Sequence, residues 1–398
     1  MSASQAFIVA AKRTPFGAFG GKLKALTANE LGGLASKAAL AELPSETPVD
    51  SVIFGNVVQT SADAPYLARH VGHRAGLPIQ VPALTLNRLC GSGFQSIINA
   101  VQEIRSGDSN IVLTGGSESM SQAPYVLRDT RWGTRYGTDL QLQDTLTASL
   151  VDRYPTPTPM GITAENLGAQ YGISRQECDE FALQSQQRWA AANAQGAFAA
   201  ELTSVAVKGK RGAVEQFTTD EHPRPQATIE GLAKLAPVFK KNDGLVTAGN
   251  ASGISDGAAA VVVASEAAVK QYGLTPLARI VSYHAVGVEP TIMGIGPAPA
   301  IRAALEKANK SLKDMDLVEV NEAFAAQYLA VEKELGLNRD VTNLNGGAIA
   351  LGHPLAASGS RIMGHLTHQL RQTKKQFAVG AACIGGGQGI AIVIENVA

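Results

Sequence analysis

The chain has 398 residues, of which 45% are hydrophobic and 17% charged, and its 34 basic side chains balance its 34 acidic ones. A neutral chain lacks the basic surface that nucleic acids and anionic membranes attract, so we expect neither as a partner. No apolar run approaches the roughly 20 residues that span a bilayer. The three cysteines, Cys90, Cys178 and Cys383, are far apart and form no C-x₂-C pair, which argues against both a disulfide framework and a zinc site. We therefore expect a globular protein without a bound metal.

Hydrophobic periodicity in the first third of the chain alternates between strand and helix patterns. It predicts strands at 6–11, 52–54, 81–86 and 111–114, with helices at 27–43, 63–76 and 94–106. The helix at 27–43 opens with a Thr-x-x-Glu capping pattern formed by Thr27 and Glu30. Such alternation predicts an α/β protein with a mostly parallel sheet covered by helices on both faces.

Cys90 lies in the glycine-lined turn between the predicted strand at 81–86 and the following helix. Near a helix N-terminus the unpaired N–H groups and the helix dipole favour a thiolate, so we expect the pKa of Cys90 to be lowered. Gly91 and Gly93 carry no side chain and leave room for a substrate carbonyl. The alternative is that Cys90 is a small buried hydrophobic residue, and this stretch alone does not decide between the two.

The segment 122–250 differs in character, because aromatic residues, prolines and charges mix and strand patterns are scarce. It holds one clear helical pattern, at 174–194, and we expect Cys178 within it to pack or face the surface. On the earlier predicted helix at 63–76, His70 and His73 lack further metal ligands nearby, which favours packing or surface positions for both.

The last third of the chain repeats the first in outline. Three segments match in the same order, namely 50–56 with 316–321, 86–87 with 344–345, and 111–116 with 377–380. Ordered matches of this kind predict a duplicated α/β unit. We expect one half at 1–121, completed by about 251–274, an inserted loop domain at 122–250, and a second half at 275–398. A site between the halves would draw one group from each equivalent turn.

Four reactive side chains fall on these turns: Cys90, Asn321, His353 and Cys383. His353 stands in a Gly-His-Pro turn, and histidine is the usual acceptor of a proton from a cysteine nucleophile. Three glycines, 385–387, follow Cys383 closely, and their exposed N–H groups suit an oxyanion hole. This glycine run fits neither phosphate-binding pattern, so we exclude a nucleotide phosphate loop. His365 and His368 follow on a predicted helix, where we expect no catalytic role.

Four sequence blocks together resemble the signature sequences of the thiolases: 87–94, 321–325, 347–354 with Gly359-Ser360, and 383–389. The resemblance covers essentially the whole chain and is closest to the mitochondrial 3-ketoacyl-CoA thiolases of fatty-acid β-oxidation. It implies the thiolase fold, in which two duplicated α/β halves form α-β-α-β-α layers with an inserted loop domain. It also implies a homotetramer in the mitochondrial matrix, with a bacterial cytoplasm as the alternative.

The same resemblance implies an acyltransferase that cleaves 3-oxoacyl-CoA with CoA to acetyl-CoA and a shortened acyl-CoA. Cys90 would attack the 3-keto group after His353 accepts its proton, and Cys383 would protonate the departing enolate. A water held by Asn321 would stabilise the enolate oxygen together with His353. The N–H groups of Cys90 and Gly385 would form an oxyanion hole. Coenzyme A is then a co-substrate, and no permanently bound cofactor is expected.

Further residues are carried over from the family as contacts of CoA. Arg224 would meet its nucleotide end and Ser252 its pantetheine arm. The tunnel between them would be lined by Phe239, Ala248, Met293, Ala323 and Phe324. Short-chain biosynthetic thiolases place a histidine where this chain has Pro159, which favours degradative use on varied chain lengths.

Other readings remain open at this stage. An acetoacetyl-CoA-forming thiolase would run the same chemistry as a Claisen condensation. A ketoacyl synthase shares the architecture but uses histidines where this chain has Cys383, and acts on carrier-bound acyl groups. An acyl-CoA hydrolase would pass the acyl group to water, and a non-catalytic acyl-CoA binder would show no turnover.

Overall fold

The computed structural model describes residues 4–209 and 212–397, and a ten-stranded mixed sheet organises them. The strands follow the order β14-β15-β16-β13-β1-β12-β5-β3-β4, with the short β2 paired to β12. Their bounds are β1 Ala6–Arg13, β2 Gly17–Ala18, β3 Ser51–Gly55, β4 Ala83–Leu86, β5 Ile111–Ser119, β12 Ser255–Ser265, β13 Ala278–Gly287, β14 Leu317–Val320, β15 Phe377–Ile384 and β16 Gln388–Asn396.

Helices cover both outer faces of this sheet. Two further helices lie between the strands of its first half and those of its second. The helices are α1 Ala28–Leu40, α2 Leu67–Arg74, α3 Ser92–Ser106, α8 Glu266–Tyr272, α9 Pro297–Lys307, α10 Ala325–Leu335, α11 Ala348–Leu351 and α12 Leu355–Thr373. Short 3₁₀ turns lie at Ala64–Tyr66, Met120–Gln122, Pro290–Ile295 and Leu312–Asp314. The predicted capping box of α1 is confirmed, since Thr27 and Glu30 each accept a hydrogen bond from the other's backbone N–H.

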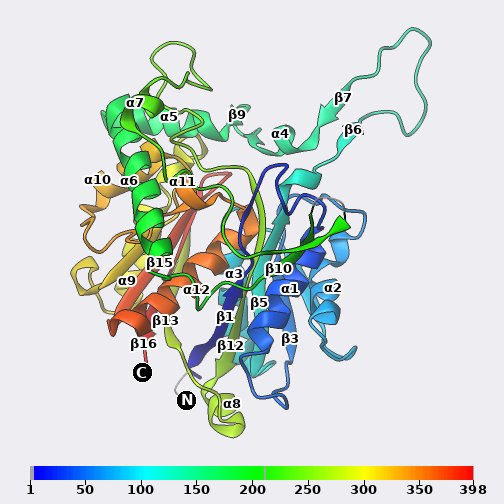
Figure 1. The fold of residues 1–398 in the computed structure, drawn as a ribbon, viewed down its shortest axis with the longest axis vertical. Coiled ribbons are helices and arrows are strands. Elements are labelled where there is room, and N and C mark those ends of the chain that lie inside the picture. Colours follow the sequence, from blue (N-terminus) through cyan, green and yellow to red (C-terminus); the bar gives the residue numbers. More distant parts are fainter. Residues whose placement is uncertain (1–3, 210–211, 398) are drawn as a thin grey trace.

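The segment between β5 and β12 forms smaller elements, of which β6, β7, α4, β9, α5 and α7 lie at the top of Figure 1 and α6 and β10 lie lower, along the body. They are β6 Tyr125–Leu127, β7 Leu142–Asp144, α4 Thr145–Ser149, β8 Val151–Asp152, β9 Thr158–Pro159, α5 Met160–Gln170, α6 Arg175–Ala194, β10 Val205–Lys208, β11 Val214–Phe217 and α7 Ile229–Ala233. The helix predicted at 174–194 is confirmed as α6, capped by Ser174.

The prediction of a mostly parallel sheet is wrong. Only the pairs β3–β4, β3–β5 and β14–β15 are parallel, whereas β12 and β16 run antiparallel to both of their neighbours. Strand β12 pairs with β1 and β5, and β16 pairs with β13 and β15, all of which precede them in the chain. The alternation of strands and helices in the sequence does not reveal these directions. The strand predicted at 81–86 forms an edge of the sheet as β4, which pairs only with β3 among the described strands and leaves Leu84 47% exposed.

Three apolar clusters divide the molecule into the expected α-β-α-β-α layers (Figure 1). One joins α1 and α2 to the strands of the first half, and another joins α9 and α10 to those of the second. Between the two lies a cluster in which α3 and α12 contact strands of both halves, with Phe94, Val261, Ile362 and Ile390 among its fully buried members. The residues that follow β3, β5, β14 and β15 thereby converge around the start of these two central helices.

The two halves that the sequence predicts to be duplicated share equivalent hydrogen bonds. Asp50 accepts hydrogen bonds from the backbone N–H groups of Asn110 and Ile111 at the start of β5. Asp316 makes the same pair of bonds, with Gln376 and Phe377 at the start of β15. Each aspartate therefore fixes the register of a parallel strand pair in its own half.

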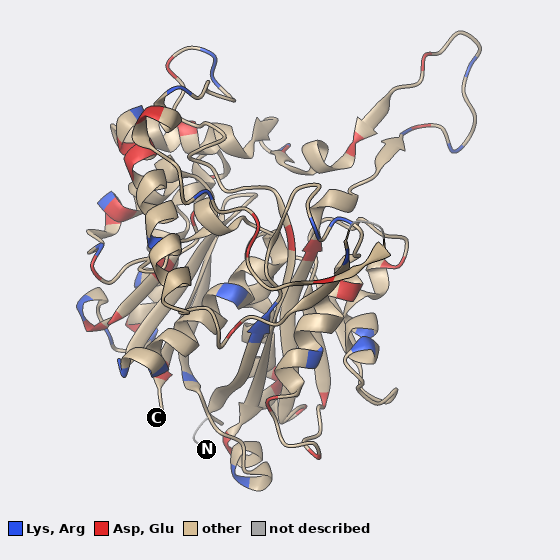
Figure 2. Ribbon diagram, in the orientation of Figure 1, with Lys and Arg blue, Asp and Glu red and all other residues tan. Residues whose placement is uncertain are grey.

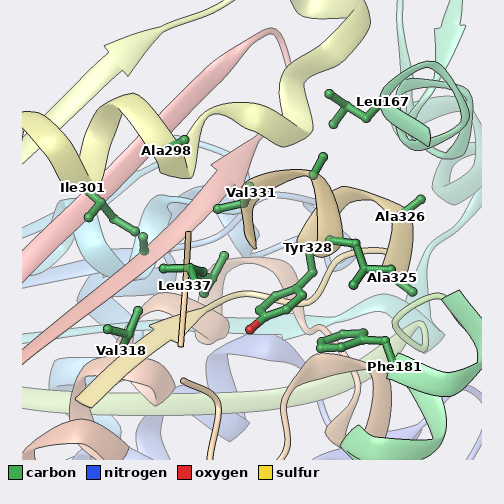
Figure 3. Close-up of a cluster of buried hydrophobic side chains, with 14 of the residues drawn as sticks. Leu167, Phe181, Ala298, Ile301, Val318, Ala325, Ala326, Tyr328, Val331 and Leu337 are labelled. Carbon is green, nitrogen blue, oxygen red and sulfur yellow. The ribbon is translucent and has the colours of Figure 1, made fainter. Parts of the chain in front are cut away.

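Helix α6 attaches the inserted segment to the second half. The ring of Phe181 stacks on that of Tyr328 in α10, with 4.1 Å between centroids, and both rings are buried (Figure 3). Cys178, one turn earlier on α6, is 1% exposed and belongs to the same cluster, which confirms its packing role. Burial raises the pKa of Cys178 to about 12, so it remains a thiol.

A buried charge network attaches the inserted segment to the sheet and to α12. Arg13 at the end of β1 contacts Glu201 at 2.6 Å and Asp220 at 2.7 Å. Glu201 also meets His365 of α12 at 2.7 Å, although the sequence had suggested no role for this histidine. Burial opposes charge at both groups, yet Arg13 and His365 hold the pKa of Glu201 below its usual range, while Glu201 raises the pKa of His365.

Charges elsewhere are mixed along the chain, with no single-sign face in the view of Figure 2. Within the described ranges, no helix combines the length and hydropathy needed to cross a membrane.

We expect Arg13→Met to lower the free energy of unfolding by about 3–5 kcal/mol, because it leaves two buried carboxylates without their common cation. Urea unfolding at pH 7 and fixed protein concentration measures the change. Lys270→Met is the control, since its ion pair with Glu266 is exposed and worth less than about 1 kcal/mol. Equal effects of the two substitutions would contradict a stabilising role for the network.

Candidate active site

The turn that carries Cys90 is held by its own neighbours. The Asn87 side chain accepts a hydrogen bond from the N–H of Leu89 at 2.9 Å. The Ser92 hydroxyl accepts from the N–H of Arg88 and donates to the carbonyl of Leu89. These bonds hold Leu89 at a φ of 47°, a left-handed conformation that costs a leucine free energy. The cysteine is thereby fixed immediately before the first turn of α3.

The surroundings of Cys90 are largely apolar. The half-buried thiol packs against a cluster formed by Val57, Val58, Met120, Leu146 and Leu355. Burial raises its pKa to about 11, and the charge of Glu118 adds to the rise, whereas the N–H groups of Gly385 and of Cys90 itself lower it. The expected lowered pKa is therefore wrong, because desolvation outweighs the helix N-terminus.

His353 lies between α11 and α12 with its ring buried. Its backbone N–H donates to the carbonyl of Gly253, and its Nδ1 lies 2.6 Å from the hydroxyl of Ser358. Its Nε2 has no hydrogen-bond partner among the described residues. Burial, and then the charge of Arg361, lower the pKa of His353 to about 4. The imidazole is thus neutral at pH 7, and with a proton on Nδ1 bonded to Ser358, Nε2 is available as a base.

Cys383 is fully buried on β15, next to the hairpin turn formed by the three glycines. Gly386 and Gly387 have φ of 76° and 77°, which other residues adopt only with strain. The Gly385 N–H contacts the sulfur of Cys90. Burial and the nearby Cys90 both raise the pKa of Cys383, so the two thiols lie close enough to influence each other. A hydrogen bond of 2.8 Å from Arg88 to Gln388 also joins the two turns.

Asn321 follows β14 and is held by its backbone N–H, which donates to Ala381 of β15 at 2.9 Å. The residue is 1% exposed, and neither its amide oxygen nor its amide nitrogen has a hydrogen-bond partner among the described residues. A buried amide without partners is costly in a folded protein. This side chain therefore has its full hydrogen-bonding capacity free for a bound molecule.

Some residues expected to contact CoA gather beside Cys383. Met293 and Ala323 form a buried cluster with this thiol, and Phe324 and Met160 pack against it. Ser252 is next to this group, because its N–H donates to the carbonyl of Ala323 at 3.0 Å. The adjoining Gly253 contacts His353, so this segment connects the predicted tunnel to the predicted base.

The remaining expected CoA contacts lie on the inserted segment. Phe239 is 37% exposed and packs over Gly161, one residue from Met160. Ala248 is exposed. Arg224 is also exposed, and its guanidinium donates to backbone carbonyls of its own loop, those of 221–223. Its described contacts do not reach the cluster around Cys383.

Several residues at this site were missed from sequence. Ser358 orients His353 but carries no sequence signal, because it is one small polar residue on a helix. Leu146 joins the pocket of Cys90 from the inserted segment, at a distance in sequence that no local pattern covers. Glu118 is fully buried near the end of β5, and its only signal in the sequence is an acidic residue in the small-residue stretch that follows the predicted strand at 111–114, since its partners lie on distant segments.

No group of three or more histidine, cysteine, aspartate or glutamate side chains within 4–209 and 212–397 is arranged to hold a metal ion. His70 instead contacts Asp63 and Asn29.

Family models for the N-terminal domain and the C-terminal domain of thiolase match residues 6–267 and 274–396. The chain belongs to the thiolase family, and the fold expected from its sequence blocks is confirmed. It is 62% identical to the mitochondrial 3-ketoacyl-CoA thiolases of Homo sapiens and of Bos taurus, over 98% of this chain and 98% of each relative. A crystal structure of the human mitochondrial 3-ketoacyl-CoA thiolase in complex with CoA superposes with a TM-score of 0.96 at 60% identity, covering 99% of this chain and 98% of that one.

We expect the rate at which iodoacetamide alkylates Cys90 to rise with pH throughout the range from about 7 to 9.5. An unperturbed thiol, with a pKa of about 8.5, would level off within that range. Quenched time points and peptide mapping give the rate and the labelled residue, and Cys90→Ser is the unlabelled control. A plateau anywhere within that range would contradict a raised pKa.

Proposed function

We propose that this protein is an acetyl-CoA C-acyltransferase, which cleaves 3-oxoacyl-CoA with CoA to acetyl-CoA and a shortened acyl-CoA. One observation carries the proposal: two thiols, one from each half, meet where the N–H of Gly385 contacts the sulfur of Cys90. A hydrolase requires one nucleophile and a base, whereas thiolysis also requires a second acid and base. Cys383 has that position.

The first half of the reaction acylates Cys90. Its sulfur attacks the C3 carbonyl carbon of the substrate while its proton passes to Nε2 of His353. The N–H groups of Cys90 and Gly385 stabilise the resulting oxyanion. The C2–C3 bond then breaks, its electron pair forms the enolate of acetyl-CoA, and Cys383 protonates C2. His353 and a water bound by Asn321 stabilise the enolate oxygen.

The second half returns the enzyme to its starting state. The thiolate of Cys383 takes the proton of an incoming CoA thiol, and the CoA sulfur attacks the acyl thioester on Cys90. The shortened acyl-CoA leaves, and Cys90 recovers its proton from His353. The high pKa of both buried thiols supports this scheme, because each thiolate is a strong base that forms only when a proton acceptor is at hand.

Coenzyme A enters this scheme as co-substrate. The human relative was crystallised with CoA, and four residues expected from the sequence to contact CoA, Ser252, Met293, Ala323 and Phe324, lie beside Cys383 here. We assign these residues to the pantetheine side of the site, and Phe239, Ala248 and Arg224 to its outer part on the inserted segment. The names of the mammalian relatives support fatty-acid β-oxidation in the mitochondrial matrix.

We also propose the division of the chain drawn from its sequence, with halves at 1–121 and 275–398 and an insert at 122–250. The insertion of β12 between β1 and β5 supports the completion of the first half by 251–274. The matched roles of Asp50 and Asp316 support the equivalence of the halves.

A homotetramer is the assembly that we propose. The hairpin β6–β7 extends away from the body (Figure 1) and carries bare apolar side chains, including Trp132 at 93% exposure and Leu142 at 67%. Apolar surface of this kind on an extended arm is typical of a protein–protein contact.

Incubation with acetoacetyl-CoA in the absence of CoA is expected to add one acetyl group to Cys90, and added CoA is expected to remove it. Intact-mass analysis and peptide mapping follow the adduct. Cys90→Ala is expected to form no adduct and to lose turnover. Cys383→Ala is the informative companion, because it keeps the nucleophile but lacks the acid that protonates C2.

Any other outcome would contradict the proposed mechanism or activity. An adduct on Cys178 or Cys383 would refute Cys90 as the nucleophile. Spontaneous loss of the adduct to water at the rate of turnover would identify a hydrolase. Tight binding of acetoacetyl-CoA without an adduct would identify a non-catalytic binder.

Sedimentation is expected to give four times the chain mass for the native protein. Replacement of Trp132, Tyr136 and Leu140 by serine is expected to yield a smaller assembly, because these side chains give the arm its exposed apolar surface. Val214→Ser, at a residue 70% exposed on β11, is the matched control. An unchanged mass in the triple variant would show that the arm does not mediate assembly.

A further inference from the structure

Glu118 is a buried carboxylate that the proposed thiolysis does not use. It stands at the end of β5 with no exposed surface. Its Oε1 accepts hydrogen bonds from the Val58 N–H at 2.8 Å and from the Asn56 amide at 3.1 Å. Its Oε2 accepts from the N–H groups of Val57 at 3.2 Å and Ala356 at 3.1 Å. Four donors around one carboxylate amount to a built site for a negative charge.

These donors come from both halves of the molecule. Asn56, Val57 and Val58 follow β3 in the first half, whereas Ala356 is in the first turn of α12, three residues after His353. A carboxylate at a helix N-terminus pairs with free N–H groups and with the positive end of the helix dipole. Glu118 therefore fixes the position of the start of α12 relative to the first half.

The nucleophile packs against the same residues. Cys90 contacts the cluster that contains Val57, Val58 and Leu355. Val57 and Val58 donate their N–H groups to Glu118, and Leu355 precedes the third backbone donor, Ala356. The charge of Glu118 also contributes to the raised pKa of Cys90. One side chain is thus coupled to the turn of the nucleophile and to the helix that begins just after the base.

We propose that Glu118 is a positioning residue of the thiolysis proposed above, whose negative charge sets the distance between Cys90 and His353. It contacts neither substrate nor the reacting atoms. Proton transfer between the sulfur and Nε2 depends on a spacing that is lost with shifts of about 1 Å. The bond from Oε2 to Ala356 is the only one of the four that crosses between the halves.

The charge of Glu118 changes in the physiological range. Burial raises its pKa to about 7, against the pull of the N–H groups of Val58, Ala356 and Val57. The ionisable groups that face it are Cys90 and, from β12, Asp256. Asn56 does not titrate, and the first turn of α12, 355–358, contains no ionisable side chain. Below about pH 7, a proton on the carboxyl group removes an acceptor from the N–H groups and loosens the start of α12.

Glu118→Gln tests this role with little change in shape. The amide nitrogen of glutamine repels N–H donors. We expect it to take the position of Oε2, because the hydrogen bonds there are longer on average and their loss costs less free energy. The variant then keeps the hydrogen bonds from Val58 and Asn56 and loses those from Val57 and Ala356. We expect kcat for acetoacetyl-CoA thiolysis to fall by about 10²-fold, with KM for both substrates nearly unchanged.

The pH profile separates positioning from general structure. In the native enzyme kcat is expected to fall as pH decreases through about 7, and this limb is expected to vanish in Glu118→Gln, which has no group to titrate there. Asp256→Asn is the matched control, since this carboxylate is also buried but bonds to Ser121 and not to α12. It is expected to keep the native kcat and to retain the limb, displaced to lower pH because the charge of Asp256, which helps to raise the pKa of Glu118, is gone.

Other outcomes would overturn the inference: native kcat in Glu118→Gln, a limb near pH 7 that persists in it, or the same loss in Asp256→Asn. A urea midpoint far below that of the native protein would identify a purely structural role. Failure of the native enzyme to cleave acetoacetyl-CoA would refute the proposed function instead. Glu118 would then be tested by alkylation of Cys90, which must be faster in Glu118→Gln because a nearby negative charge is gone.

Discussion

The site depends on the close approach of α12 to the first half of the sheet. A side chain at Gly116 would overlap the carbonyl of Ala356, and one at Gly93 would overlap the backbone of Ser360. These contacts of backbone against backbone leave no space for water between β5, α3 and α12. Because His353 and Cys90 lie at the starts of α12 and α3, any residue larger than glycine here would separate the two.

Sequence reasoning identified the elements and the turns but not how they face one another. Strands, helices and the capping box of α1 follow from local periodicity, so those predictions held. The direction of β12 depends on pairing with β1 and β5 across more than a hundred residues, which local patterns do not encode, whereas β16 reverses direction in a hairpin with the adjacent β15. For the same reason Glu118 and Leu146 went unnoticed, since their roles arise only when distant segments meet. The expected low pKa of Cys90 failed because burial is a property of the whole fold.

In the interior, the paired charges belong to a structural network, whereas the groups of the proposed active site are neutral. Glu201 pairs with Arg13 and with His365, whose pKa it raises, and the contacts of this network are remote from the two thiols. Cys90, Cys383 and His353 are instead held neutral by burial. A neutral site avoids the cost of burying an ion pair before substrate arrives, and its low dielectric strengthens each hydrogen bond made during reaction. The unpaired atoms of Asn321 and His353 are the local cost of that arrangement.

The matched roles of Asp50 and Asp316 bear on how such a site can exist at all. Two identical units related by symmetry would present the same side chain at both equivalent turns. A nucleophile facing its own copy, or a base facing its own copy, cannot transfer a proton in a defined direction. Joining the units in one chain removes that constraint, because each copy can change alone. The division of labour that we propose for Cys90 and His353 is therefore a property of the covalent link between the halves as much as of either turn.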